Sequence, residues 1–343
     1  ERKADIEDFL AEIGKDCKVI FTGAGTSEYV GNIATDYLKS HGDFKFESIA
    51  TTDLVSAPYL HFEKGRKTLL VSFARSGNSP ESLAAVKLGR QLVDDFYNLP
   101  ITCAENGKLA ANLKEDPKSY VFLNPEYTND KGFAMTNSFS SMLLASLLIF
   151  DTKTQNKAEI VEKLSTIAKE IYERSQEIEN LVNFDFDRVV YLGSGPLGKL
   201  SKEARLKILE LTAGKVATIW DSSMGFRHGP KSFINDKTLV ISFISENAYT
   251  RAYDLDVLDE IVADDIAPKI IGISNSKIDR PYEFILESEG VNDAYLAIAY
   301  AVFAQLVSLI TSLRVGNTPD NPSSTHTVNR AVSYTHLTLP TTP

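Results

Sequence analysis

Several short runs of the chain are apolar almost throughout, and longer stretches with helical spacing separate them. Runs without polar alternation are typical of strands buried on both faces of a parallel sheet. The alternation of such runs with helices therefore indicates the α/β class. We predict strands over residues 18–22, 45–50, 68–73, 100–103, 189–192, 216–220, 238–243 and 270–274, and helices over 27–40, 80–93, 197–211 and 252–262.

The pattern occurs twice at a fixed offset. FTGAGTS begins at Phe21 and YLGSGPL begins at Tyr191, 170 residues later. TLLVSFARSGNS at Thr68 and TLVISFISENAY at Thr238 keep the same offset. A repeat of this length indicates two duplicated domains rather than a solenoid. We predict a first domain over residues 1–160 and a second over 161–331, each a parallel sheet flanked by helices.

Three segments lie outside the repeat. Residues 157–181 have the spacing of an amphipathic helix, with Ile160, Leu164, Ile167, Ile171 and Ile178 on its apolar side. The apolar stretch 294–310 is shorter than the ~20 residues that a membrane span requires, so we predict a buried core helix there. Residues 332–343 resemble a translated sequencing-library adapter, and we interpret them as a non-native tail.

Charge and composition exclude several classes of function. The chain has 36 Lys and Arg against 46 Asp and Glu, which gives a net charge of −10. Such a balance disfavours nucleic-acid binding, which depends on neutralising phosphates. Two cysteines and five scattered histidines show no metal-ligand spacing, so we expect no metal and no cofactor. With no targeting segment visible, we expect a cytoplasmic protein that has no membrane contact.

Two loops of the first copy have the composition of an anion site. In open parallel sheets, ligands bind at the carboxyl ends of the strands, where the strand order reverses. Glycines there allow close approach, and helix N-termini present N–H groups to a phosphate. The alternative is that these residues only cap two helices. The candidate residues are Gly25, Thr26 and Ser27 after the first strand, and Arg75, Ser76, Gly77, Asn78 and Ser79 after the third.

The second copy differs at the same loops. Its third-strand loop contains Glu246 in place of glycine-rich sequence, and this carboxylate would repel a phosphate. Its first loop contains GxGxxG at Gly193, Gly195 and Gly198, which raises the alternative of a dinucleotide fold. The first copy has Glu28 in place of the third glycine, which argues against this alternative. We therefore assign the phosphate to the first copy.

Acid–base candidates lie in the second copy. Glu203, Lys207 and Glu210 share one face of a predicted helix, and for Glu203 and Lys207 alone an exposed salt-bridged stripe is the simpler interpretation. Glu210 lies where the helix becomes apolar, and partial burial suits a general base that works near neutral pH. A lone histidine can be merely structural, but His228 lies in a Gly-Pro turn between Arg227 and Lys231, which suits a proton carrier.

The order of GAGTS, SGNSPES, KILEL and HGP over a duplicated α/β unit resembles the sugar isomerase (SIS) domain family, across residues 18–330. Strings such as TTDLVSAP, GFAMTNSFSSM and GFRHGPKS are similar to bacterial AgaS-type galactosamine-6-phosphate deaminase/isomerases, also described as tagatose-6-phosphate ketose/aldose isomerases. The resemblance implies two tandem SIS domains, each a flavodoxin-like α-β-α sandwich.

The same resemblance implies roles for individual residues. Ser27, Ser76 and Ser79 match phosphate-binding hydroxyls. Glu210 matches a carboxylate that moves a proton between C1 and C2 in the related glucosamine-6-phosphate synthase isomerase domain. His228 matches a histidine linked there to ring opening, and Lys207 and Glu203 match polar helix residues of that site. In that synthase a C-terminal tail completes the site, and here the adapter-like string stands in its place.

The implied activity is conversion of galactosamine 6-phosphate to tagatose 6-phosphate and ammonia in amino-sugar catabolism, by a homodimer or higher homo-oligomer. One alternative is plain aldose/ketose isomerisation of a hexose 6-phosphate. Another is a non-catalytic phosphosugar-binding regulator. The regulator is disfavoured because such proteins usually add a helix-turn-helix DNA-binding domain, which is not visible here, and because the chain is acidic.

Overall fold

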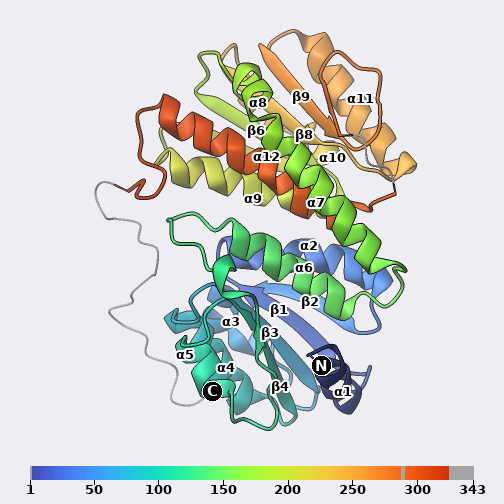
Figure 1. The fold of residues 1–343 in the computed structure, drawn as a ribbon, viewed down its shortest axis with the longest axis vertical. Coiled ribbons are helices and arrows are strands. Elements are labelled where there is room, and N and C mark those ends of the chain that lie inside the picture. Colours follow the sequence, from blue (N-terminus) through green and yellow to red (C-terminus); the bar gives the residue numbers. More distant parts are fainter. Residues whose placement is uncertain (1, 287–289, 324–343) are drawn as a thin grey trace. The chain divides into compact units, whose positions relative to one another are not determined.

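The computed structural model describes residues 2–286 and 290–323, and the tail predicted at 332–343 lies outside them. The described residues form two compact units. The N-terminal unit contains residues 2–131 and 135–154, and the C-terminal unit contains 155–286 and 290–323 together with the short segment 132–134. The division falls between Thr154 and Gln155. Each unit contains one five-stranded parallel sheet with helices on both faces (Figure 1).

In the N-terminal unit the strand order is β2-β1-β3-β4-β5, and every described pair is parallel. The central strands β1 and β3 are buried along their whole length, as their continuous apolar sequence predicts. The strands are β1 (Lys18–Gly23), β2 (Lys45–Ala50), β3 (Thr68–Ala74), β4 (Phe96–Thr102) and β5 (Phe122–Leu123).

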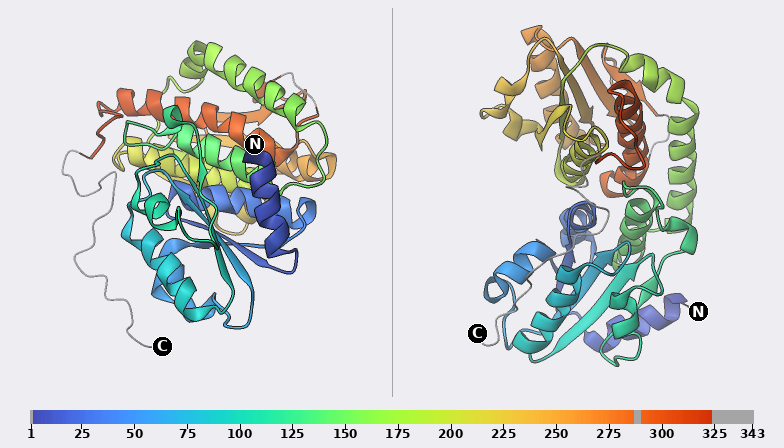
Figure 2. Two further views of the ribbon diagram at one scale, coloured as in Figure 1. Left: turned by 60° about the horizontal axis from the view of Figure 1, so that its bottom comes forward. Right: turned by 90° about the vertical axis from the view of Figure 1, so that its left-hand side faces the viewer.

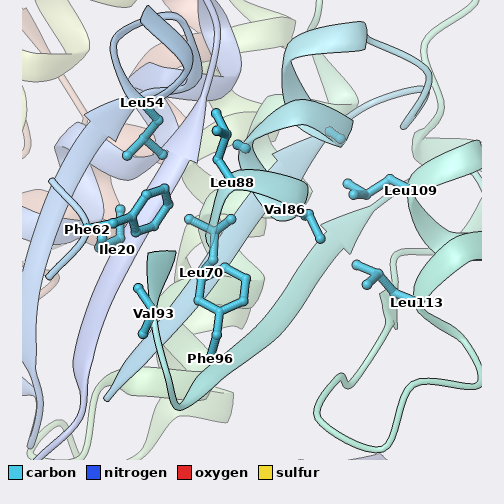
Figure 3. Packing of buried hydrophobic residues seen from close by; sticks show 12 residues of the cluster. Ile20, Leu54, Phe62, Leu70, Val86, Leu88, Val93, Phe96, Leu109 and Leu113 are labelled. Carbon is cyan, nitrogen blue, oxygen red and sulfur yellow. The ribbon is translucent and has the colours of Figure 1, made fainter. Parts of the chain in front are cut away.

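Two different apolar layers cover this sheet. On one face, Phe21 packs among other aromatic rings beneath α2 and α6, which contact each other. On the opposite face, Ile20, Leu70 and Phe96 from three strands pack against Leu88 of α4 (Figure 3). The helices of the unit are α1 (Arg2–Ile13), α2 (Thr26–His41), α3 (Thr51–Ser56), α4 (Pro80–Leu92), α5 (Lys108–Leu113) and α6 (Asn137–Phe150), with 3₁₀ turns η1 (Pro58–Leu60) and η2 (Glu126–Thr128).

The C-terminal unit repeats the same connectivity, with the order β10-β9-β8-β6-β7. Its α9 and α12 pack together over one face of the sheet, and α10 and α11 cover the other (Figure 2). The strands are β6 (Arg188–Gly193), β7 (Ala217–Ser222), β8 (Thr238–Phe243), β9 (Lys269–Ser274) and β10 (Glu283–Ile285). The helical elements are α7 (Lys157–Glu173), α8 (Ser175–Leu181), α9 (Gly195–Leu211), α10 (Ser223–Phe226), η3 (Pro230–Phe233), α11 (Ala248–Asp264) and α12 (Asp293–Arg314).

The predicted helix over 157–181 is two helices rather than one. Its five predicted apolar residues are all buried, so the predicted apolar side is correct. The break falls at Arg174, between α7 and α8. There the guanidinium lies 3.8 Å from the centre of the Phe284 ring and donates a hydrogen bond of 2.5 Å to the carbonyl of Ile285. This tertiary contact with β10 lies at the break, and local periodicity does not encode it.

The apolar stretch 294–310 belongs to a longer helix than predicted. Helix α12 has 22 residues, so its length and composition alone would allow it to cross a membrane. However, 61% of its most apolar window is buried inside the protein, where it packs against α9 and α7. The interpretation as a core helix agrees with this burial, whereas the argument from a short length was wrong.

Candidate active site

The strand order places the two predicted anion-binding loops side by side. Strands β1 and β3 are hydrogen-bonded neighbours, and Thr22 is in register with Ser72 near their carboxyl ends. The chain leaves β1 through α2 towards β2, and leaves β3 through α4 towards β4. The connections therefore diverge between β1 and β3, which is the topological switch point where such sheets bind ligands.

The first loop brings a helix N-terminus very close to the strand. A Cβ atom on Gly23 would lie 2.5 Å from the carbonyl carbon of Ser27, so only glycine fits there. Gly25 has a φ of 58°, which also favours glycine. Thr26 and Ser27 follow as the first, buried residues of α2. The Ser27 hydroxyl thus lies in the first turn of α2, 3.8 Å from the sulfur of Met135.

The second loop is held from behind by the segment that begins α5. Lys108 N–H donates to the side-chain carbonyl of Asn78 (3.1 Å), and Leu109 N–H donates to the Gly77 carbonyl (2.9 Å). A Cβ on Gly107 would lie 2.3 Å from the Ser76 carbonyl oxygen. This supporting segment was not predicted, since its role depends on a contact between loops about 30 residues apart.

The remaining residues of this loop agree with its predicted geometry. Gly77 has a φ of 64°, and the Ser76 hydroxyl accepts a hydrogen bond from Asn78 N–H (3.4 Å). Ser79 precedes the first residue of α4, and its hydroxyl lies 2.7 Å from that of Ser82. Arg75 is only 8% exposed. The loop therefore gathers a cation, hydroxyls and a helix N-terminus beside the first loop.

Another helix N-terminus in this unit already holds a carboxylate. Asp130 accepts hydrogen bonds from Asn137 N–H (2.9 Å), from Ser138 N–H (3.0 Å) and from both the N–H and the hydroxyl of Thr136 (3.0 and 2.7 Å) at the start of α6. Burial opposes the charged form of Asp130, but the hydroxyl and N–H donors hold the pKa of its carboxyl below the ordinary value. The N-terminus of α6 is therefore filled from within the chain.

Glu203, Lys207 and Glu210 lie together on α9, but not as an exposed stripe. The ammonium of Lys207 lies 3.5 Å from Glu203 Oε1 and 2.7 Å from Glu210 Oε2. Lys207 is 1% exposed and Glu203 is 2% exposed, whereas Glu210 is partly exposed. The exposed-stripe interpretation of Glu203 and Lys207 was wrong, because helix periodicity does not show that α12 packs along α9.

The ammonium at the centre of this cluster is strongly held. Burial disfavours the charged form of Lys207, but the carboxylates of Glu203 and Glu210 outweigh it and raise the pKa of the lysine. A carboxylate that is hydrogen-bonded to a fixed ammonium keeps one orientation. Glu210, the only partly exposed member of the three, therefore presents an oriented carboxylate towards the surface.

The HGP turn carries an exposed His228 between two cations that are already neutralised. Arg227 forms ion pairs of 2.6 Å with both Asp256 and Glu260 of α11. Lys231 pairs with Glu260, and also with Asp264 at 2.5 Å. Gly229 has a φ of 119°, a conformation that favours glycine. Contrary to expectation, the positive charges of Arg227 and Lys231 are paired with carboxylates of α11, and the role of His228 stays a prediction.

The GxGxxG string of the second copy has a packing role in this structure. A Cβ on Gly193 would lie 2.8 Å from the carbonyl carbon of Leu197, and one on Gly198 would lie 2.9 Å from the Gly193 oxygen. These glycines let α9 begin close to β6, as Gly23 does for α2 beside β1. In the described ranges 2–286 and 290–323, no group of three or more His, Cys, Asp or Glu side chains could hold a metal ion.

The fold is a duplicated α/β domain with two glycine-rich loops at the switch point of its first copy, and comparison with known proteins gives its family. The family model described as the SIS domain matches residues 12–151. A D-galactosamine-6-phosphate deaminase AgaS of Escherichia coli is 42% identical over 92% of this chain and 83% of its own length. The protein of that name from Shewanella sp. is 40% identical over 92% of this chain and 80% of its own.

A solved structure gives the same result. The crystal structure of tagatose-6-phosphate ketose/aldose isomerase from Escherichia coli superimposes with a TM-score of 0.88 at 40% identity, covering 94% of this chain and 89% of that one. The chain therefore belongs to the SIS domain family, in the group of the AgaS proteins.

The cluster on α9 generates a prediction about stability. Lys207→Met removes the ammonium from between two carboxylates, and we expect the free energy of unfolding to fall by about 3–5 kcal/mol, as when one partner of a buried ion pair is lost. Urea unfolding of the variant and of Lys169→Met, which removes an exposed helix lysine, would measure this. Equal free energies of unfolding for the two variants would contradict the prediction that the ammonium of Lys207 stabilises the fold.

The sign of the pH dependence follows from the raised pKa of Lys207. A lysine whose pKa is raised on folding adds its full contribution to the free energy of unfolding at pH values below its ordinary pKa of 10.5. That contribution is lost as the pH rises through the raised pKa of the folded state. The stability difference between the wild type and Lys207→Met should therefore be constant from pH 7 to 9 and shrink above about pH 10.5.

Proposed function

We propose that this chain converts galactosamine 6-phosphate to tagatose 6-phosphate and ammonia. The observation that carries the proposal is the identity of about 40% to proteins named galactosamine-6-phosphate deaminases, over at least 80% of their length. The two anion loops and the Glu203–Lys207–Glu210 cluster supply the chemistry that this reaction needs. In this proposal residues 1–160 bind the phosphate, and residues 161–331 supply the groups that transfer protons.

The phosphate is proposed to dock at the ends of β1 and β3. Hydroxyls of Ser27, Ser76 and Ser79 and N–H groups at the starts of α2 and α4 can donate to its oxygens. Gly25, Thr26, Gly77 and Asn78 shape the two loops, and Arg75 adds a positive charge. This local site works against the net charge of −10, because the helix dipoles and the buried guanidinium act at short range.

Glu210 is proposed to transfer the proton. It removes the proton from C2 of the open-chain amino sugar and returns it to C1, so that the amine at C2 becomes a ketimine. Water then adds to C2, and the C2–N bond breaks to release ammonia and the ketose. Lys207 orients Glu210 through the 2.7 Å contact, and His228 passes the proton that opens the sugar ring.

A second candidate function is plain isomerisation of a hexose 6-phosphate. The Escherichia coli protein whose crystal structure superimposes on this chain is named tagatose-6-phosphate ketose/aldose isomerase, and that name favours isomerisation for that relative. The same carboxylate would then move a proton through an enediol, and no nitrogen would be released. Parallel turnover measurements on amino and neutral sugar phosphates separate the two candidates.

For assembly and location, we propose a cytoplasmic homodimer or higher homo-oligomer. Tyr59 and Leu60, neighbours on the η1 turn, are 74% and 69% exposed, which suits a surface that another copy covers. The substrate is a small, highly charged sugar phosphate, which is consistent with a protein acting in the aqueous cell interior.

The first test is release of ammonia from galactosamine 6-phosphate. The full chain and a chain with the C-terminal segment of the Escherichia coli relative in place of residues 332–343 should be compared. We expect ammonia and ketose in equal amounts from at least the second form, detected with coupled assays. Ketose without ammonia from a neutral sugar phosphate would favour the isomerase, and no product from either form would contradict both.

A second test changes the proposed base. Glu210→Gln keeps the shape of the side chain but cannot accept the C2 proton, so we expect kcat to fall by about 10²–10⁴-fold with phosphosugar binding retained. The measurements are steady-state kinetics and calorimetric titration. Glu173→Gln, which changes an exposed helix carboxylate, is the matched control and should keep wild-type kinetics. A wild-type kcat in Glu210→Gln would exclude Glu210 as the base.

A third test concerns the phosphate. Ser27→Ala removes one donor to a charged ligand, and the expected loss of about 1.5–3 kcal/mol of binding raises KM about 10- to 150-fold. Because the hydroxyl does not touch the reacting carbons in this proposal, kcat should stay within about twofold. Ser56→Ala, at an exposed serine of α3, should leave both constants unchanged. An unchanged KM in Ser27→Ala would remove this residue from the phosphate site.

A further inference from the structure

One buried carboxylate joins the carboxyl ends of three neighbouring strands in the C-terminal unit. Asp254 of α11 is fully buried. Its Oδ1 accepts hydrogen bonds from the hydroxyls of Ser194 (2.5 Å) and Ser223 (2.6 Å), and its Oδ2 accepts one from Ser245 N–H (3.0 Å). Ser194, Ser223 and Ser245 follow β6, β7 and β8, which are adjacent in the order β8-β6-β7. A single side chain therefore holds three loops together.

This position corresponds to the proposed phosphate site of the other unit. Strands β6 and β8 stand in the C-terminal sheet where β1 and β3 stand in the N-terminal sheet. In both units the loops after these strands present hydroxyl and N–H donors to the switch point. In the C-terminal unit the donors of Ser194 and Ser245 already serve Asp254. A side-chain carboxylate thus accepts hydrogen bonds from both loops at the second switch point.

A second carboxylate completes the arrangement. Asp293 accepts hydrogen bonds from the Ser245 hydroxyl (2.5 Å) and from Glu246 N–H (2.8 Å). Glu246 pairs with Arg251 at 3.5 Å and accepts a hydrogen bond from the Ser276 hydroxyl (3.1 Å). Three acidic side chains therefore gather at the second switch point, which explains why this copy does not suit a phosphate.

Asp254 is connected to the HGP turn through Ser223. Ser223 is the first residue of the short α10, which ends at Phe226, and His228 N–H donates to the Gly225 carbonyl (2.9 Å). The hydrogen bond from Ser223 to Asp254 therefore anchors the start of a five-residue path to His228. Ser223 and Phe226 are fully buried, so this path is packed into the unit before it reaches the exposed histidine.

The same helix holds the far side of the turn. Asp256, Glu260 and Asp264 of α11 pair with the cations that flank His228. Helix α11 thus supports the turn with Asp254 where the turn begins and with the ion pairs of Arg227 and Lys231 around the histidine. The buried contact has fixed geometry, whereas the ion pairs are partly exposed and individually weak.

We propose that Asp254 is a positioning residue, which fills the anion site of the C-terminal unit and through Ser223 fixes the turn that carries His228. The catalytic part of this inference rests on the proposed function, because it takes His228 to act in ring opening. The structural part rests on the three hydrogen bonds alone.

The test uses Asp254→Ala, which removes the carboxylate and leaves space for a small anion. We expect kcat on galactosamine 6-phosphate to fall about 10- to 100-fold, the size expected when a catalytic group is misplaced. KM should stay within about twofold, since the proposed phosphate site lies in the other unit. Backbone amides over residues 222–228 should exchange hydrogen faster, as measured by mass spectrometry. Formate should restore both kcat and protection.

The controls separate positioning from general damage. Asp259→Asn changes another carboxylate of α11, which pairs with Arg280 at 3.0 Å, and should leave kcat and exchange over 222–228 unchanged. A purely structural role for Asp254 would speed exchange throughout the C-terminal unit, including α12, and formate would not restore kcat. That result would overturn the proposal, as would wild-type kcat and exchange in a folded Asp254→Ala.

Two further outcomes are also decisive. If Asp254→Ala does not fold, Ser223→Ala and Ser194→Ala each remove one donor, and wild-type exchange over 222–228 with wild-type kcat in both would overturn the proposal. If the wild type releases no ammonia from galactosamine 6-phosphate, the proposed function fails by itself. Exchange over 222–228 and its restoration by formate then still decide whether Asp254 fixes the turn.

Discussion

Oriented hydrogen-bond donors at the carboxyl ends of parallel strands need acceptors, and the fold places such donors at the switch point of both of its copies. Each switch point collects N–H groups, hydroxyls and a helix N-terminus, and burying such donors without an acceptor is costly. In the C-terminal unit the carboxylates of Asp254 and Asp293 accept these hydrogen bonds, so the acceptors come from the chain itself. In the N-terminal unit the segment from Arg75 to Ser79 contains no acidic residue, although the buried Glu81 follows in the first turn of α4, and the proposed ligand would supply the anionic acceptor.

The same balance of buried charge governs the α9 cluster. One buried ammonium is placed between two carboxylates of the same helix. The positive charge of Lys207 reduces the repulsion between the two carboxylates. The carboxylates in turn stabilise its protonated form, which raises the pKa of the lysine. Glu210 gains a fixed orientation from the same contact. Lys207 therefore contributes both to the stability of the fold and to the proposed chemistry.

Much of the fold could be predicted because the repeat and the apolar runs are local signals. Strands β1 and β6 begin at Lys18 and Arg188, and β3 and β8 begin at Thr68 and Thr238, so both pairs keep the offset of 170 that the motifs show. The short edge strands β5 and β10, with two and three residues, were not predicted because so few residues carry no period.

The site was only partly accessible from sequence. The glycine-rich loops were predicted because their composition reflects backbone constraints, as the close contact at Gly23 shows. The burial of Glu203 and Lys207 and the neutralisation of Arg227 depend on how α12 and α11 pack against distant residues, which no local pattern contains. Asp254 was not predicted, although Val257, Leu258 and Ile261 at i+3, i+4 and i+7 place it on the buried side of α11, because its serine partners lie in distant loops.

The two switch points also differ in what they leave for a ligand. In the C-terminal unit Ser194, Ser223 and Ser245 donate their hydrogen bonds to the buried carboxylate of Asp254. Under the proposed function, only the N-terminal unit keeps its donors for a phosphate. A duplicated fold can thus use one switch point as an internal support while the other serves the ligand.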